Sequence, residues 1–322
     1  MAPVRIAVVG AGPAGLFFAA CVGRKVPHCR VTVFERRSDQ TPSGWGVVLA
    51  ARALQEVAVD VPELAAAVRE EGTYWDRLDI HHRERTSTAQ VQGYYSIARQ
   101  RLVNLLTEDV RRFGVDLQFG VDIQPDSDLL DPYDLIVAAD GVNSRFRSPL
   151  VRERHGLETD LSTNRYSWLG TYKSFDAFQF IFQETVAGWI WAHVYPDRRG
   201  MTTFIVECED LTWRNLGLGD MSEQATVEFL QRLFEEALGG HALASSLPNS
   251  YWPGWKRFRR VPLGPLFGHR TYLIGDAGCT LHFSVGSGIR KAFGDGSALA
   301  ATIARHGVTQ AALQACERDR LS

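Results

Sequence analysis

The first feature of this sequence that could do chemistry is a glycine-rich turn near the start of the chain. Residues 10–15 read GAGPAG and lie between an apolar run typical of a buried strand, Val4–Val9, and an apolar run typical of a helix. In such a unit Gly10 permits the tight turn, Gly12 lets the backbone approach a pyrophosphate, and Gly15 lets the helix pack closely on the strand. A helix that begins at Pro13 also offers free N–H groups and a positive dipole to phosphates. The turn therefore predicts a dinucleotide site.

An acidic residue follows where such a site needs one. The next predicted strand, Val31–Phe34, ends at Glu35, about 20 residues beyond the turn, where a carboxylate can accept hydrogen bonds from a ribose diol. Arg36 and Arg37 come directly after it. These two arginines fit either a site for the extra phosphate of NADP or solvated charges at the end of a strand.

Two later strands also run into an aspartate. Residues 134–139 read DLIVAA and precede Asp140-Gly141, and residues 271–274 read TYLI and precede Gly275-Asp276. A glycine-rich stretch with Gly286 and Gly288 then leads into a helical run to about residue 306. Because the carboxyl ends of parallel strands share one edge of a sheet, where ligands bind in such folds, we expect these aspartates beside the glycine turn.

Together these motifs resemble the FAD-dependent aromatic hydroxylases, the single-component flavoprotein monooxygenases typified by p-hydroxybenzoate hydroxylase. That family has a GxGxxG motif, a DG motif and a GD motif in this order, and the resemblance covers nearly the whole chain. It is closest over residues 44–49 (GWGVVL), 170–209 and 281–288 (LHFSVGSG). These stretches resemble the branch that holds salicylyl-CoA 5-hydroxylase, anthraniloyl-CoA monooxygenase and the violacein-pathway hydroxylases.

The resemblance implies which residues hold FAD. The glycine turn would bind the pyrophosphate, Glu35 the adenosine ribose and Asp276 the ribityl hydroxyls, while Arg99, with Arg101 as its rival, would reach the phosphate and ribityl region. The helix after Gly288 would lie under the flavin pyrimidine, where its positive end stabilises the reduced ring. The implied cofactor-binding residues are Gly10, Gly12, Pro13, Ala14, Gly15, Glu35, Arg36, Val47, Arg99, Asp140, Asp276, Gly286 and Gly288.

The middle of the chain is dense in aromatic residues with a period of two, which is typical of antiparallel strands with one buried face. One reading is a plain sheet core, and the other is a sheet whose face covers an aromatic-lined pocket over the flavin. The substrate-binding candidates are Phe180, Phe182, Trp191, His193 and Phe283. A lone histidine on a strand is more often structural than a base, so no residue is assigned an obligatory acid–base role.

The chemistry that the resemblance implies belongs mainly to the cofactor. NAD(P)H would reduce FAD, O2 would add to give a C4a-hydroperoxide, and one oxygen atom would pass to an electron-rich aromatic ring. The GD motif continues here as Ala277-Gly278-Cys279 where the family has Ala-Ala-His. This departure leaves two alternatives open, a flavin-binding partner that does not hydroxylate, and a flavin oxidoreductase that inserts no oxygen.

A basic cluster at residues 256–260, KRFRR, has two readings. It is either a solvated connection before the final strand or a site for the phosphates of a coenzyme A thioester or a carrier-protein arm. The substrate is thus expected to be a small aromatic molecule, free or bound to CoA or a carrier.

Composition agrees with an enzyme of this kind. The 322 residues carry 35 Lys+Arg and 37 Asp+Glu, a net charge of −2, which disfavours binding to nucleic acid, and the 5 scattered cysteines suit a reducing cytoplasm rather than disulfides or a metal site. The glycines interrupt the apolar stretch after Arg5, so no membrane segment is expected. We predict an α/β protein with a Rossmann-like FAD-binding domain (residues 1–72, 93–160 and 265–322) and an inserted, mostly antiparallel β substrate domain (73–92 and 161–264).

Overall fold

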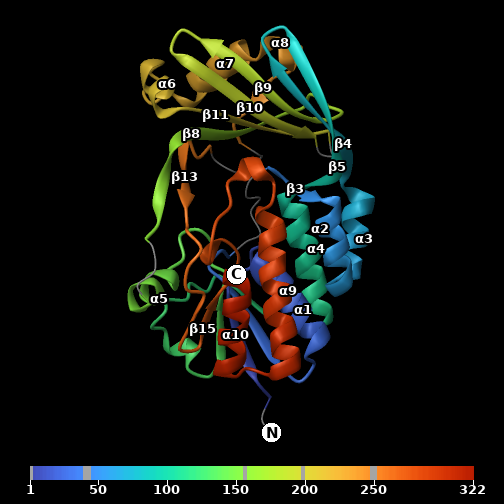
Figure 1. The fold of residues 1–322 in the computed structure, drawn as a ribbon, viewed down its shortest axis with the longest axis vertical. Coiled ribbons are helices and arrows are strands. Elements are labelled where there is room, and N and C mark those ends of the chain that lie inside the picture. The colour runs from blue at the N-terminus through green and yellow to red at the C-terminus, as the bar shows by residue number, and fades with distance from the viewer. Residues whose placement is uncertain (1–2, 39–44, 155–157, 197–199, 247–251) are drawn as a thin grey trace.

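The computed structural model describes residues 3–38, 45–154, 158–196, 200–246 and 252–322. Within these residues two sheets organise the chain, a six-stranded sheet at the bottom of Figure 1 and a nine-stranded sheet at its top. The smaller sheet is parallel except for its outermost pair. Its strands, in spatial order, are β14 (Phe267–Gly268), β15 (Thr271–Leu273), β7 (Leu135–Ala138), β1 (Arg5–Val9), β2 (Arg30–Glu35) and β6 (Asp116–Phe119).

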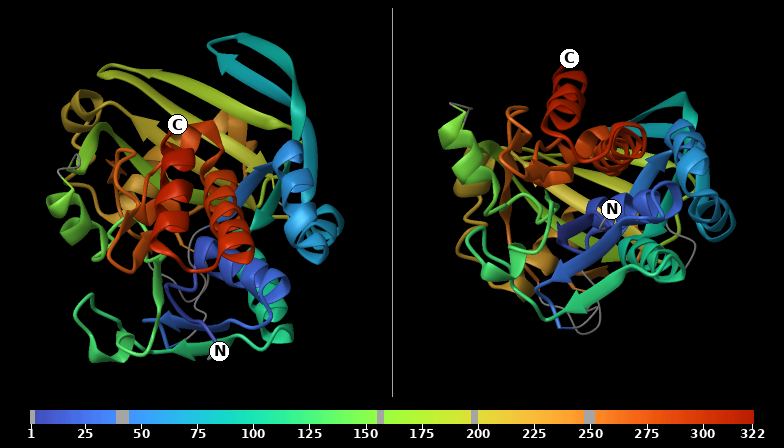
Figure 2. Two further views of the ribbon diagram at one scale, coloured as in Figure 1. Left: turned by 60° about the horizontal axis from the view of Figure 1, so that its bottom comes forward. Right: turned by 90° about the horizontal axis from the view of Figure 1, so that it is seen from below.

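Helix α1 (Pro13–Lys25) is the centre of the packing on this sheet. Its first ten residues are all buried, because it contacts both α4 (Arg99–Arg112) and α9 (Gly288–His306). Phe17 of α1 stacks on Phe293 of α9 at 4.2 Å between ring centroids. Figure 2 shows α10 (Gln310–Leu321) beside α9. The remaining helices of this half are α2 (Ala51–Asp60), α3 (Pro62–Glu71) and α5 (Arg147–Glu153).

The larger sheet is antiparallel apart from the parallel pair β4 and β9. Helices α6 (Asp210–Asn215), α7 (Glu223–Leu233) and α8 (Glu235–Leu238) cover its outer face (Figure 1). Its strands, in spatial order, are β12 (Leu243–Ala244), β8 (Asp160–Thr171), β11 (Thr202–Cys208), β10 (Gly188–Pro196), β9 (Phe178–Thr185), β4 (Thr73–His82), β5 (Arg85–Ala98) and β3 (Gly46–Ala50), with β13 (Lys256–Arg260) pairing with β8.

The two faces of the larger sheet carry different side chains, as the alternation along each strand requires. On the outer face, Phe204 and Val206 of β11 pack against the helices in one apolar cluster. On the inner face, Ile205 of β11 and Tyr195 of β10 belong to a separate, aromatic cluster with Trp75 of β4. The aromatic residues with a period of two thus form the inner face.

The observed architecture is the predicted mixed α/β fold with a Rossmann-type unit and a mostly antiparallel sheet. The residue boundaries of the two predicted domains stay a prediction. Of the two readings of residues 256–260, a plain connection does not hold, because these residues form strand β13, which pairs with β8 and is exposed only at its two ends.

Candidate functional site

The dinucleotide motifs meet at one edge of the six-stranded sheet. Val9 at the end of β1 pairs with Phe34 of β2 on one side and with Ala138 of β7 on the other, and Ala138 also pairs with Leu273 of β15. The residues that follow these strand ends, among them Glu35 and the two motif aspartates, therefore share that edge.

Two adjoining cavities, which share several lining residues, lie at this edge. The smaller has a volume of about 390 Å³ and the larger about 730 Å³, and both are lined by Gly12, Pro13, Arg99 and Asp276. The cofactor candidates of the smaller cavity also include Gly10, Glu35, Arg36 and Asp140. Those of the larger cavity also include Ala14, Val47, Gly286 and Gly288.

The glycine turn leaves an open space at Gly12. A Cβ atom built on Gly12 has no heavy atom within 4 Å, although the residue adopts ordinary extended backbone angles. Helix α1 begins beside it with no side-chain cap and no acidic residue in its first turn. This open helix N-terminus fits a pyrophosphate.

Gly15 has a different environment and lines neither cavity. A Cβ atom there would lie 2.1 Å from the carbonyl oxygen of Gly10, and 3.0 Å from Val8 Cγ1. Gly10 itself has φ +109°, which disfavours any side chain. Gly15 thus permits the close approach of helix and strand rather than ligand contact.

Two polar side chains at the edge, Asp140 and Arg99, are placed to contact a ligand. Asp140 accepts a hydrogen bond from the Arg145 amide at 2.8 Å through Oδ2, while its buried Oδ1 has no hydrogen-bond partner in the described part of the chain. Burial raises the pKa of Asp140 and lowers that of Arg99, which lines both cavities. A free carboxylate oxygen and a desolvated guanidinium at this edge fit the hydroxyls and phosphates of a dinucleotide.

Glu35 joins the second strand to the glycine turn. Its Oε2 accepts a hydrogen bond from the Ala11 amide at 2.9 Å, and its Oε1 accepts one from the Arg37 amide at 3.0 Å. Since Glu35 lines the smaller cavity, this carboxylate is fixed in place next to the space that a ribose would fill. Arg36 is exposed at the rim of the same cavity.

The DG and GD motifs are braced by Arg147, the first residue of α5. Its guanidinium is buried and donates to the carbonyl oxygen of Val142 at 2.7 Å and to that of Ala277 at 3.2 Å. This one side chain therefore holds the two motifs together.

Asp295 of α9 braces the GD motif from the other side. This buried carboxylate accepts hydrogen bonds from the Gly275 amide at 2.9 Å and from Lys291 Nζ at 2.6 Å, and its second oxygen accepts one from Arg320 of α10 at 2.6 Å. The neighbouring Gly296 allows α9 to approach α1, because a Cβ there would lie 3.3 Å from Phe18.

Arginine 101, the rival of Arg99, is engaged elsewhere. Its guanidinium pairs with Glu71 at 2.6 Å and contacts Glu108 at 3.3 Å, and it lines neither cavity. Of the two arginines that open α4, Arg99 is the one placed at the edge.

The larger cavity lies between the sheet edge and the inner face of the nine-stranded sheet. Of the predicted substrate residues, Phe180, His193 and Phe283 line it. Phe182 and Trp191 do not, and instead their rings lie 6.2 Å apart in a stacked arrangement further along β9 and β10. Aromatic residues that the prediction did not single out complete the wall: Trp75, Tyr94, Tyr166, Trp168, Phe178 and Tyr195.

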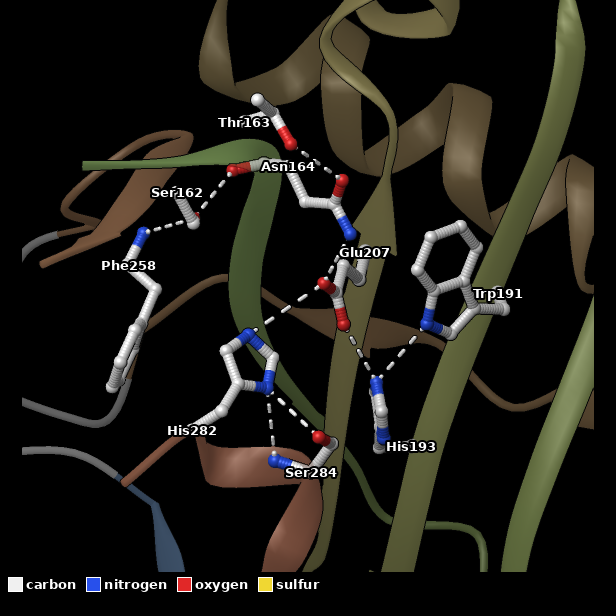
Figure 3. A network of polar contacts seen from close by, with 9 residues as sticks. All are labelled: Ser162, Thr163, Asn164, Trp191, His193, Glu207, Phe258, His282 and Ser284. Carbon is white, nitrogen blue, oxygen red and sulfur yellow. Dashed lines mark hydrogen bonds and ion pairs between the residues drawn. The ribbon is translucent and has the colours of Figure 1, made fainter. Parts of the chain in front are cut away.

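A buried polar network adjoins this cavity (Figure 3). Glu207 of β11 accepts from Asn164 Nδ2 at 2.9 Å and lies 3.0 Å from His193 Nε2 and 3.7 Å from His282 Nε2. Sequence reasoning gave Glu207 and His282 no role. The available signal was a carboxylate at the penultimate position of the otherwise uncharged strand TTFIVEC.

The basic strand β13 also lines the larger cavity, with Lys256, Arg257, Phe258 and Arg259. Arg257 Nε is buried and has no hydrogen-bond partner in the part of the chain that the structure describes. Arg260, at the end of the strand, pairs on the surface with Asp160 at 2.5 Å.

Comparison with known proteins places these features in a family. Residues 8–57 match the NAD(P)-binding Rossmann-like domain. The chain is 35% identical over 311 residues to salicyloyl-CoA 5-hydroxylase of a Streptomyces species, covering 93% of this chain and 58% of that protein. It is 33% identical to protodeoxyviolaceinate monooxygenase of Chromobacterium violaceum (90% and 76% covered) and 30% identical to 3-hydroxy-4-methyl-anthranilyl-[aryl-carrier protein] 5-monooxygenase of Streptosporangium sibiricum (92% and 78%).

Solved structures share the fold. The oxygenase of 2-methyl-3-hydroxypyridine-5-carboxylic acid aligns with a TM-score of 0.78 at 18% identity, covering 98% of this chain and 86% of that one. CtdE in complex with FAD aligns with a TM-score of 0.73 at 17% identity, covering 99% and 89%.

The protein shares this architecture, a Rossmann-type unit with an antiparallel sheet over one edge, with CtdE, whose structure contains FAD. The chain belongs to the FAD-dependent aromatic monooxygenase family. It spans little more than half the length of the salicyloyl-CoA enzyme. In the described residues, every helix is too short or too polar to cross a membrane.

Proposed function

We propose that this protein binds FAD and uses NAD(P)H and O2 to hydroxylate an electron-rich aromatic substrate. The observation that carries the proposal is that the two cavities adjoin each other, one lined by the dinucleotide motifs and the other by aromatic side chains, with Arg99 and Asp276 on the wall of both. A dinucleotide that fills the first cavity would extend its reactive ring into the second.

The chain's own residues would hold FAD in the following way. The N-terminus of α1 at Gly12 would take the pyrophosphate, Glu35 the adenosine ribose, and Arg99 with Asp140 and Asp276 the phosphate and ribityl groups. The N-terminus of α9, which begins at Gly288 without a side-chain cap, would face the flavin ring. When bound, FAD supplies the chemistry, accepting a hydride from NAD(P)H and passing one atom of O2 to the substrate ring.

The protein would contribute exclusion of water and orientation of the ring. Trp75, Phe178 and Tyr195 form a stacked and tilted aromatic group on the inner face of the sheet, with Phe178 and Tyr195 centroids 5.8 Å apart. Such a wall is low in polar groups and suits a flat aromatic substrate.

The finer part of the proposal concerns the acyl carrier. Two relatives are named for substrates bound to CoA or to an aryl-carrier protein, and Arg257 and Arg259 line the substrate cavity here with a free Nε on Arg257. We infer that the aromatic acid enters as a thioester whose phosphates meet β13.

The inference that β13 binds the phosphates of a thioester is tested by comparing Arg257→Gln with the wild type on two substrates, salicyloyl-CoA and free salicylate. We expect KM for the thioester to rise roughly tenfold, about 1.4 kcal/mol, with KM for the free acid unchanged. Arg260→Gln is the matched control, because that arginine is exposed and paired with Asp160. Equal effects on both substrates would contradict the inference.

The redox function is tested by the visible spectrum of the purified protein with FAD, before and after NADPH under argon and in the presence of salicyloyl-CoA. Bound flavin that bleaches, followed after aeration by a product heavier by one oxygen atom, is the expected result. A product lighter by two hydrogens would indicate an oxidoreductase without oxygen insertion, and a protein that binds no flavin would refute the proposal.

A further inference from the structure

One carboxylate in the protein lies between two histidines at the wall of the substrate cavity. Glu207 and His193 are each 3% exposed, and the pair is joined by a 3.0 Å contact from Glu207 Oε2 to His193 Nε2. The side chain of His282 is 30% exposed and faces the other oxygen, Oε1. The arrangement therefore runs from a buried ring at the cavity, through a carboxylate, to a ring that reaches solvent (Figure 3).

The charge on Glu207 decides where His193 carries its proton. Hydrogen bonds from His193 and Asn164 outweigh the burial of this carboxyl and lower the pKa of Glu207, so it is ionised at neutral pH. A lone pair on Nε2 would face that negative charge at 3.0 Å, whereas a proton there donates to it. The ionised carboxylate thus selects the tautomer with Nε2–H.

The same tautomer leaves a lone pair on Nδ1 of His193. This nitrogen is buried and has no hydrogen-bond partner in the described parts of the chain, and Figure 3 shows the ring directed away from Glu207 on this side. The ring is held edge-on by Phe180 at 4.8 Å and Phe283 at 5.4 Å, both of which line the larger cavity with it. An acceptor without a partner at a cavity wall is suited to a group on a ligand.

Trp191 competes for the same nitrogen. Its indole Nε1 lies 3.2 Å from His193 Nε2 and would donate to it in the opposite tautomer, which places the proton on Nδ1. The two tautomers differ in what His193 Nδ1 offers to a ligand: the Nε2–H tautomer leaves it a base, and the Nδ1–H tautomer makes it a hydrogen-bond donor. The tautomer of His193 therefore decides whether this residue can be the base.

Ionisable groups on the elements around His193 include Glu207 of β11, His282 of the loop before α9, Tyr166 of β8 and Tyr195 of β10. The cations Lys256, Arg257 and Arg259 of β13 line the same cavity as His193. Burial raises the pKa of Tyr166, so its phenol stays protonated, and the Tyr195 hydroxyl donates to the Gly46 carbonyl oxygen at 2.9 Å. Burial lowers the pKa of His282, which keeps that ring neutral.

We propose that His193 Nδ1 is the base that accepts the proton from the ring hydroxyl or amino group of the substrate, with Glu207 as the residue that positions it and His282 as the link to solvent. This inference rests on the proposed function. The O–H or N–H bond of the substrate breaks and its electron pair stays on the heteroatom, which makes the ring more electron-rich. The proton forms a new bond to Nδ1, and Glu207 stabilises the resulting imidazolium.

The tautomer is measured by long-range 1H–15N correlation on protein labelled at histidine nitrogen, with the His193 signal assigned by its loss in His193→Gln. We expect the Nε2–H tautomer in the wild type and a shift toward Nδ1–H in Glu207→Gln, whose amide can donate to Nε2. Glu153→Gln is the matched control, since that carboxylate contacts the exposed His269 at 3.3 Å on the surface. A wild type with the proton on Nδ1, or a tautomer that does not respond to Glu207→Gln, would overturn the proposal.

A kinetic readout separates the base from a structural role. With salicyloyl-CoA as the substrate, His193→Gln should lower kcat on the order of a hundredfold. The same substitution should remove the acid limb of the pH profile of kcat. Flavin affinity and the rate of bleaching by NADPH should stay at wild-type values. A wild type that binds no FAD would refute the proposed function but not the tautomer result, whereas an unchanged kcat and pH profile in His193→Gln would place the base elsewhere.

Discussion

The two glycines of the turn separate ligand binding from folding, and alanine substitutions distinguish these roles. Gly12→Ala places a methyl group where the protein has no heavy atom within 4 Å, whereas Gly15→Ala places one 2.1 Å from the carbonyl oxygen of Gly10. The first methyl group enters the space that a pyrophosphate needs. The second must push α1 away from the strand it packs on.

The magnitudes follow from these contacts. Overpacking costs typically 1–3 kcal/mol, and a backbone collision flanked by Val8 Cγ1 at 3.0 Å belongs at the upper end, so we expect about 3 kcal/mol for Gly15→Ala. At roughly 2 °C per kcal/mol for a chain of this size, the apoprotein Tm should fall by about 6 °C. Gly12→Ala should change the free energy of unfolding by less than about 1 kcal/mol, the cost of a weaker helix cap.

The assay is the apoprotein Tm by circular dichroism together with the FAD Kd by quenching of flavin fluorescence. Gly12→Ala should keep its Tm and lose FAD affinity about a hundredfold, near 2.8 kcal/mol. In Gly15→Ala the main effect should be the lower Tm of the apoprotein. A Gly12→Ala protein with wild-type FAD affinity, or a Gly15→Ala protein with wild-type Tm, would refute the reasoning.

Three further outcomes are expected. Glu35→Ala should weaken FAD binding by about 1.5–3 kcal/mol, measured as Kd, because a charge-assisted hydrogen bond is lost. Asp295→Ala should lower the free energy of unfolding by about 3 kcal/mol in urea titration, since it leaves Lys291 without its partner and a buried amide unsatisfied. The folded pKa of His282 lies below its ordinary 6.5 and that of Glu207 below 4.5. At these two residues the unfolded chain therefore binds more protons, and through His282 the Tm should fall as pH drops below about 6.5, a decline that His282→Gln should reduce between pH 7 and 5.

Much of the Rossmann-type unit could be predicted because local sequence dictates it. The run Ile6–Val9 is apolar throughout and becomes the buried β1, and Pro13 begins α1 at the first helical position, where its missing N–H costs nothing. Glu35 and Asp276 follow strand ends, and the parallel register of the sheet then places them at one edge.

The substrate side could be predicted less well, because its geometry depends on pairing between distant strands. Phe180 and Phe182 look equivalent in sequence, but only the first lies over the cavity. Glu207 contacts His193 because β10 and β11 pair. It also lies close to His282, which belongs to a loop more than 70 residues further along the chain. Strand β13 could not be predicted from its composition. A run of four cations and one aromatic residue is typical of a solvated segment, and only its pairing with the distant strand β8 makes it part of the sheet.

Helix α10 acts on the GD motif from a distance. Arg320, two residues before the end of the sequence, reaches Asp295, which in turn holds the Gly275 amide at the start of the GD motif. Unwinding of α10 around Arg320 would therefore release one of the contacts that hold Asp295 against the GD motif. Substitutions in α10 that loosen its packing on α9 should accordingly lower the amount of FAD that the protein retains, although α10 is separated from the cavities by α9.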